Sequence, residues 1–213
     1  MKYLKVQYSN MNKVVTSWEV DPRADKWKWG HGFLSMRGFE SGSVIYLKPK
    51  KERVKNQIER LVEWSLGSRN WIVCISESTT YVRRLFDYVL ACYVFTTEDR
   101  AISVDVDDLI IAANDPEGEK RDIIEHANLL LINYCDPNNP QLGWRRGSIV
   151  NILHRRKHKG LATMFNLFVR VIPKKMDSSK ALELTKGIVD VFGGTAYELF
   201  TDKNSKRVVI REE

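Results

Sequence analysis

A lysine-rich turn between a short apolar strand and a helical pattern is the first stretch of this sequence that could do chemistry. Residues 45–58 read IYLKPKKERVKNQI. A strand, a turn and a helix in that order are where many proteins hold the phosphates of a nucleotide. Such a turn depends on glycines, which let backbone N–H groups come close to the phosphates. This turn has none, so it is a ruined phosphate loop, a basic patch with another purpose, or a charged connection.

Positive charge is concentrated in a few places along the chain. The formal net charge is +7, and clustered cations on a small domain favour an anionic partner, most often nucleic acid. Basic residues lie at 145–146 and at 170, 174 and 175, as well as in two longer runs. We predict that the two longer runs contact phosphates in a sequence-independent way, or else an acidic protein surface: Lys48, Lys50, Lys51 and Arg53 in the turn, and Arg155, Arg156, Lys157 and Lys159 in the segment HRRKHKG. The alternative is a protein with excess lysine and no such partner.

Other reactive groups have no supporting pattern. Acidic residues gather between 98 and 119 and could bind a divalent metal in a nuclease, but alternating Val and Asp more simply indicates a strand or loop with one wet face. His154 and His158 have a zinc-compatible spacing, but the cations around them disfavour a metal. The three cysteines form no CxxC pair and are typical of small buried side chains. We expect no metal site and no catalytic residue.

The elements that must position these groups alternate between strands and helices. Apolar runs predict buried strands at 44–47, 70–76, 128–133 and 161–169, and helical spacing predicts helices at 54–62, 78–92, 119–127, 146–158 and 178–192. Ser78 is a plausible helix cap, and Gly193-Gly194 ends the last helix. We predict a loop at 136–144 and a hairpin over 197–212, and residues 96–116 are ambiguous. The alternation predicts an α/β domain with a mainly parallel sheet flanked by helices.

The chain length of 213 residues fits one domain, or one domain with a small appendage. We expect residues 1–39 to be an irregular, aromatic-rich N-terminal segment and residues 40–213 to be the α/β domain. In the first part, Trp27 and Trp29 either join the core or stack on bases. No apolar run approaches the roughly 18 residues that cross a bilayer, and the N-terminus has no secretory pattern. We therefore expect a cytoplasmic protein without a membrane partner.

This order of elements resembles the AAA+ ATPase core, and most of all the branch of helicase loaders and insertion-sequence ATP-binding proteins. In that branch a strand leads into G-x-x-x-x-G-K-[ST] and a helix. Laid on this pattern without a gap, the loop falls on Pro49–Asn56. Pro49 and Val54 then stand at the glycines, Lys55 stands at the phosphate-binding lysine, and Asn56 replaces the magnesium-binding hydroxyl. The resemblance makes this turn a lost phosphate loop whose lysines remain.

The later motifs of the family depart from the pattern in a similar way. The third buried strand ends in Asn133 and Tyr134, where the family has an Asp that holds Mg²⁺ and an acid that polarises water. Asn166 falls on the polar residue that orients the attacking water. The resemblance therefore implies four relic nucleotide-binding positions, Lys55, Asn56, Asn133 and Asn166, with fold elements covering about residues 40–172.

The function implied by the resemblance is that of a catalytically degenerate AAA+-like accessory protein of DNA replication or of a mobile element. It would bind DNA, a replicative helicase or another ATPase subunit rather than hydrolyse ATP, and it would need no cofactor. Two alternatives stay open. One is a slow nucleotide-binding ATPase that uses Lys55 with a displaced acid such as Asp136. The other is a scaffold that binds only protein. The oligomeric state is left open by the sequence.

Overall fold

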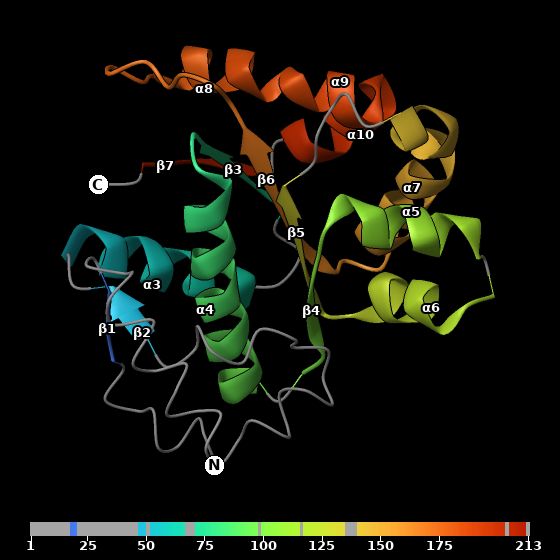
Figure 1. The fold of residues 1–213 in the computed structure, drawn as a ribbon, viewed down its shortest axis with the longest axis horizontal. Coiled ribbons are helices and arrows are strands. Elements are labelled where there is room, and N and C mark those ends of the chain that lie inside the picture. Colours follow the sequence, from blue (N-terminus) through green and yellow to red (C-terminus); the bar gives the residue numbers. More distant parts are fainter. Residues whose placement is uncertain are drawn as a thin grey trace.

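The protein is described by a computed structural model (Figure 1), which covers residues 18–20, 47–49, 52–66, 71–97, 99–115, 117–134, 140–202 and 205–211. The elements in chain order are β1 (Trp18–Val20), β2 (Leu47–Pro49), α3 (Glu52–Leu66), β3 (Trp71–Ser76), α4 (Thr79–Thr97), β4 (Ala101–Val104), α5 (Val106–Asn114), α6 (Glu119–His126), β5 (Leu129–Tyr134), α7 (Pro140–His158), β6 (Ala162–Phe168), α8 (Ser178–Thr185), α9 (Gly187–Phe192), α10 (Gly194–Thr201) and β7 (Lys206–Ile210). None of the helices in these ranges is long and apolar enough to cross a membrane.

Five strands form one parallel sheet in the order β4-β5-β6-β3-β7. All six residues of β3 are buried, as expected for a parallel strand with neighbours on both edges and helices on both faces. This arrangement confirms the predicted α/β fold with a mainly parallel sheet.

Alternate side chains of each strand enter two separate cores. On one face, Ile72 and Cys74 of β3 pack with apolar residues of α3 and α4. On the other face, Trp71, Val73 and Ile75 pack with α5, α7 and the three helices α8 to α10. Side chains of successive residues in a strand point to opposite faces, so an unbroken apolar strand must be covered on both. Figure 1 shows α3 and α4 on one side of the sheet and α5 to α10 around the other.

Two predicted elements differ from the structure because their partners are distant in sequence. The predicted hairpin over 197–212 is wrong: residues 197–201 belong to α10, and β7 pairs with β3 in parallel. The ambiguous stretch 96–116 contains β4 followed by α5, and α7 begins at Pro140, inside the predicted loop. Gly193 ends α9 as predicted, because its φ of +86° is a conformation that favours glycine.

A second, two-stranded sheet lies apart from the main one. β1 and β2 pair antiparallel, with Trp18 opposite Pro49. β1 lies within residues 1–39 and β2 within residues 40–213, and the predicted boundary between the two parts stays a prediction. Trp27 and Trp29 lie outside the described residues.

Candidate functional site

The carboxyl ends of β3 and β6 mark the place in this fold where a ligand is expected. The two strands are parallel neighbours, paired from Trp71↔Thr163 to Ser76↔Phe168. The chain continues from β3 into α4 on one face of the sheet, and from β6 towards α8 on the other face. Parallel α/β sheets bind ligands outside the strand ends where neighbouring connections leave to opposite faces. We call this place the β3–β6 switch point.

Side chains of the protein itself occupy the switch point. Ser76 Oγ donates a hydrogen bond of 2.8 Å to Asn166 Oδ1, and both residues are only 1% exposed. The Val169 N–H donates to the carbonyl of Ser76 over 2.8 Å, and the Ile172 N–H donates to the carboxylate of Glu77. These bonds join the two strand ends and engage the polar side chains of Ser76, Glu77 and Asn166.

The connection from β3 to α4 consists of Glu77 and Ser78 alone. Ser78 Oγ accepts a hydrogen bond from the Tyr81 N–H over 3.2 Å, which confirms the predicted cap of this helix. A phosphate loop at a strand–helix junction needs glycines and a lysine in a longer turn, but residues 77–80 read Glu-Ser-Thr-Thr. Glu77 also brings negative charge, which repels phosphate. Residues 77–80 therefore lack the glycines and the lysine of a phosphate loop.

The alignment of a phosphate loop on Pro49–Asn56 is wrong in its premise. β2, the strand before this turn, pairs with β1 outside the five-stranded sheet and does not end at the switch point. Lys55 lies within α3, with Nζ 3.8 Å from Glu52 Oε2, and Asn56 is exposed on the same helix. The local order of strand, turn and helix predicted a phosphate loop after β2. A ligand site at a strand end also requires that the strand belong to the main sheet, and β2 does not.

The phosphate contacts predicted for the turn stay predictions. The side chains of Lys48, Lys50, Lys51 and Arg53 lie outside the described residues.

Asn133 and Asn166 lie at the carboxyl ends of the adjacent strands β5 and β6. A register shift between Ile132 and Tyr134 places Tyr134 opposite Asn166. Asn133 Nδ2 donates to Ser103 Oγ over 3.0 Å, so it joins β5 to β4 as Asn166 joins β6 to β3. Within the described ranges, Asn133 Oδ1 and Asn166 Nδ2 are buried without a hydrogen-bond partner. Neutral amides neither balance the charge of Mg²⁺ nor act as a base. The relic role of both residues stays a prediction.

The acidic stretch after β4 is engaged in structural contacts. Asp108 accepts a hydrogen bond from the Asp105 N–H over 3.0 Å and forms an ion pair of 2.6 Å with Lys120. Asp105 lies 3.5 Å from Arg83. These contacts cap α5 and join it to α6 and α4. In the part of the chain that the structure describes, no group of three His, Cys, Asp or Glu side chains could hold a metal ion.

Arg156, predicted to contact phosphate, is instead a core residue, and that prediction is wrong. Its side chain is 0% exposed. Its guanidinium donates to the carbonyls of Ile124, Ala127 and Ala162 over 2.6 to 2.8 Å, and to Thr163 Oγ1 over 3.2 Å. Burial lowers the pKa of the guanidinium to about 9, so it keeps its charge at neutral pH. Arg156 joins α6 and α7 to the start of β6.

The other members of the HRRKHKG run also make contacts within the protein. Lys157 Nζ lies 2.6 Å from Asp202 Oδ2 and over the ring of Trp71, 4.9 Å from its centroid. Lys159 Nζ lies 2.8 Å from His126 Nε2. Arg155 is exposed and pairs with Glu125 over 3.3 Å. Only Arg155 and Lys159 of the predicted set in this run present exposed cations.

Glu125 of α6 pairs with Arg121 of the same helix and with Arg155 of α7, and these contacts predict a pH effect. Burial raises the pKa of its carboxyl, but the hydrogen bonds and charges of Arg121 and Arg155 outweigh burial and lower the pKa below its ordinary value. A lowered folded-state pKa stabilises the protein above the unfolded value and loses that contribution as the pH falls through the folded value. We expect Glu125→Gln to reduce the free energy of unfolding by about 1–2 kcal/mol at pH 7.

Urea titrations of both proteins at pH 7 and at about pH 3.5 measure this effect. The difference should shrink at the lower pH, whereas the exposed Glu117→Gln should change little at either. An equal difference at both values would contradict the role assigned to the ionised Glu125.

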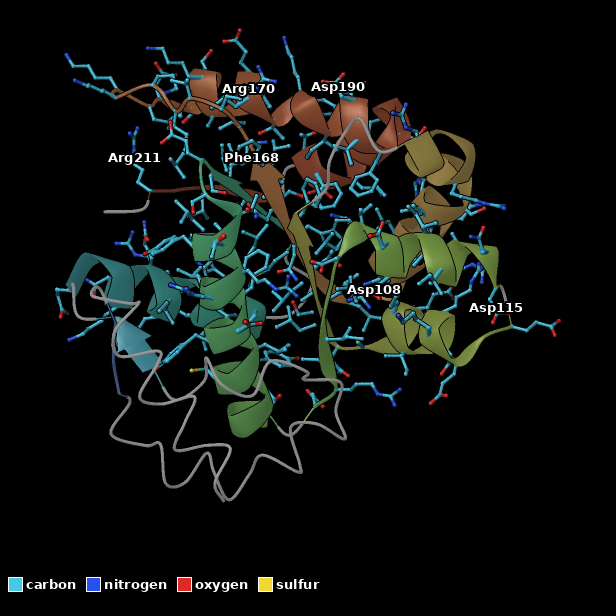
Figure 2. All side chains as sticks on the ribbon, in the orientation of Figure 1. Asp108, Asp115, Phe168, Arg170, Asp190 and Arg211 are labelled. Atoms are coloured by element: carbon cyan, nitrogen blue, oxygen red, sulfur yellow. The ribbon has the colours of Figure 1, made fainter. Side chains whose placement is uncertain are left out.

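A basic surface without a predicted role lies beside the switch point. Between β6 and α8, the side chains of Arg170, Lys174 and Lys175 are exposed. Arg211 follows β7, the other neighbour of β3, and its guanidinium donates to the carbonyl of Pro173. Figure 2 shows Arg170 and Arg211 on the side of the molecule where β3, β6 and β7 end. The sequence contained one sign of this surface, since its basic residues directly follow the predicted strand that contains Asn166.

Comparison with solved structures places this geometry in a known fold. The chain is similar to the DnaC helicase loader, with a TM-score of 0.60 and 13% sequence identity over 76% of this chain and 93% of that one. It is also similar to a candidate primosome component from Streptococcus pyogenes serotype M3, with a TM-score of 0.55 and 10% identity over 89% of this chain and 96% of that one. The chain therefore has the AAA+-like P-loop NTPase fold, as the resemblance implied.

No protein-family model matches the sequence, and no curated protein matches it significantly.

Proposed function

We propose that this chain is an accessory protein of DNA replication that works by binding DNA and a helicase or related ATPase subunit, without hydrolysing nucleotide. The observation that carries the proposal is the two-residue junction between β3 and α4. Proteins with a parallel α/β sheet commonly bind phosphate at such a junction. Here the junction holds the Ser76–Asn166 hydrogen bond and the Glu77 carboxylate, which accepts the Ile172 N–H.

The replication role is supported by the two similar structures, which are described as a helicase loader and a candidate primosome component. A shared fold can serve many functions, so the binding surfaces have to carry the rest of the proposal. The net charge of +7 is in keeping with a nucleic-acid partner, since neutralised phosphates release counterions and favour association. Affinity for DNA should then fall steeply with salt and depend little on sequence.

The first test is calorimetric titration of the protein with ATP, with and without Mg²⁺. We expect no saturable heat in either case, because the β3–α4 junction has no glycine and no lysine, and among the described residues no group of three His, Cys, Asp or Glu side chains could hold a metal ion. Fluorescence anisotropy with labelled DNA on the same sample should show binding that ATP does not change. Saturable ATP binding at micromolar concentrations would contradict the nucleotide-independent role.

A further inference from the structure

The segment between β6 and α8 presents exposed cations and exposed apolar side chains. Arg170, Lys174 and Lys175 are exposed, Val171 is 72% exposed, and Phe168 at the end of β6 is 37% exposed. Val171 and Phe168 are two of the few large apolar residues in the described part that are exposed to this degree. With Arg211 they form what we call the β6–α8 surface.

Three contacts hold this segment in place. The buried Ile172 donates its N–H to the Glu77 carboxylate. Arg211 donates to the carbonyl of Pro173, and Asp177 caps α8 by accepting from the Lys180 N–H over 2.8 Å. A surface whose backbone is held before binding loses less conformational entropy on binding. In the sequence, Ile172 lies between Arg170–Val171 and the two lysines, so its contact with Glu77 holds the backbone next to both groups of exposed residues.

Charge on this surface favours an anionic ligand. The segment and its neighbours carry four cations, Arg170, Lys174, Lys175 and Arg211, but only two carboxylates, Glu77 and Asp177. Both carboxylates already accept hydrogen bonds from backbone N–H groups. Residues 170 to 175 span at most about 18 Å when extended. This reach matches a few consecutive phosphates of one nucleic-acid strand.

We propose that the β6–α8 surface binds single-stranded nucleic acid, with its cations on the phosphates and Phe168 beside an unstacked base. This assignment rests on the proposed function and specifies the surface that contacts the nucleic acid. A single strand is favoured over a duplex because its base faces are open to stacking on an aromatic ring. Contacts of exposed lysines and arginines with phosphate position the strand without reading its sequence.

The test compares two triple variants with the same change in charge. Arg170→Ala with Lys174→Ala and Lys175→Ala removes the β6–α8 cations. Arg60→Ala with Arg100→Ala and Arg145→Ala removes three exposed cations from α3, from the loop before β4 and from α7. Anisotropy titrations use labelled oligo(dT) of 20 nucleotides, the matching duplex and polyglutamate at several salt concentrations. Thermal unfolding monitored by circular dichroism verifies that each variant is folded.

We expect the β6–α8 triple variant to bind oligo(dT) roughly 100-fold more weakly at 0.1 M salt, and its salt slope to fall by about 2, because each phosphate contact on a single strand contributes about 0.7 to the slope. The control variant should lose much less.

Three results would overturn the assignment. The first is an unchanged affinity of the β6–α8 variant, or an equal loss in the control, while the wild type binds. The second is binding of the duplex as tight as that of the single strand, and the third is binding of polyglutamate as tight as that of oligo(dT). Absence of nucleic-acid binding by the wild type would instead remove the DNA-binding part of the proposed function, together with this assignment.

Discussion

Asn166→Asp is expected to lower the free energy of unfolding by roughly 2–4 kcal/mol at pH 7, because it places a carboxylate where almost no surface is exposed. Asn166 is 1% exposed, and only Ser76 donates to its side-chain oxygen. The second oxygen of the new carboxylate would take the place of Nδ2, which has no partner among the described residues.

The effect should depend on pH in a defined direction. Burial raises the pKa of a carboxyl group above its ordinary value of about 3.9. A raised folded-state pKa means that stability is intact below the unfolded value and is lost as the pH rises through the folded value. Protonated Asp closely matches Asn in shape, so the variant should approach the wild type near pH 4. Urea titrations of both proteins at pH 7 and pH 4 measure the two differences.

This variant tests whether the switch point is closed. The control is Asn151→Asp on the exposed face of α7, which should change stability by less than about 0.5 kcal/mol. If Asn166→Asp is equally mild at pH 7, water reaches the switch point, and the protein does not close this position with its own side chains. The outcome therefore bears directly on the nucleotide-independent function.

Replacement of Arg156 by Met should cost about 3–5 kcal/mol of unfolding free energy, because removal of one partner of a buried polar cluster leaves the others unsatisfied. The carbonyls of Ile124, Ala127 and Ala162 would each lose a donor. Arg156→Lys should also be destabilising, since one ammonium cannot reproduce the planar guanidinium that reaches all of these acceptors. Chemical denaturation monitored by circular dichroism measures both changes.

The neighbouring Arg155→Met provides a matched control. Arg155 is exposed and makes one ion pair, with Glu125, so its loss should cost about 1 kcal/mol or less. If Arg156→Met is as stable as the wild type, the buried hydrogen bonds of Arg156 contribute little to the free energy of unfolding. Any fall in DNA affinity of Arg156→Met should accompany unfolding, because the residue does not reach the surface.

Much of the fold was predictable because its signals are local. An apolar run such as 70–76 is buried as a central parallel strand, and Ser78 caps the next helix, since both follow from residues next to one another in sequence. The position of Asn133 and Asn166 at strand ends was predictable for the same reason. The C-terminal strand was mistaken for half of a hairpin, because its partner β3 lies more than a hundred residues earlier and leaves no local signal.

The sequence by itself determined the alternation of strands and helices, the helix caps and the excess of positive charge, since these depend on side-chain type and short-range spacing. Tertiary structure alone decided which strand end lies at the switch point, and it assigned that place to β3 rather than to the lysine-rich turn. It also decided which cations face solvent. Arg156 and Arg170 are the same residue type, but one satisfies backbone carbonyls in the core and the other lies exposed beside the ends of the sheet. Burial depends on contacts between distant segments, and charge clustering in the sequence does not contain that information.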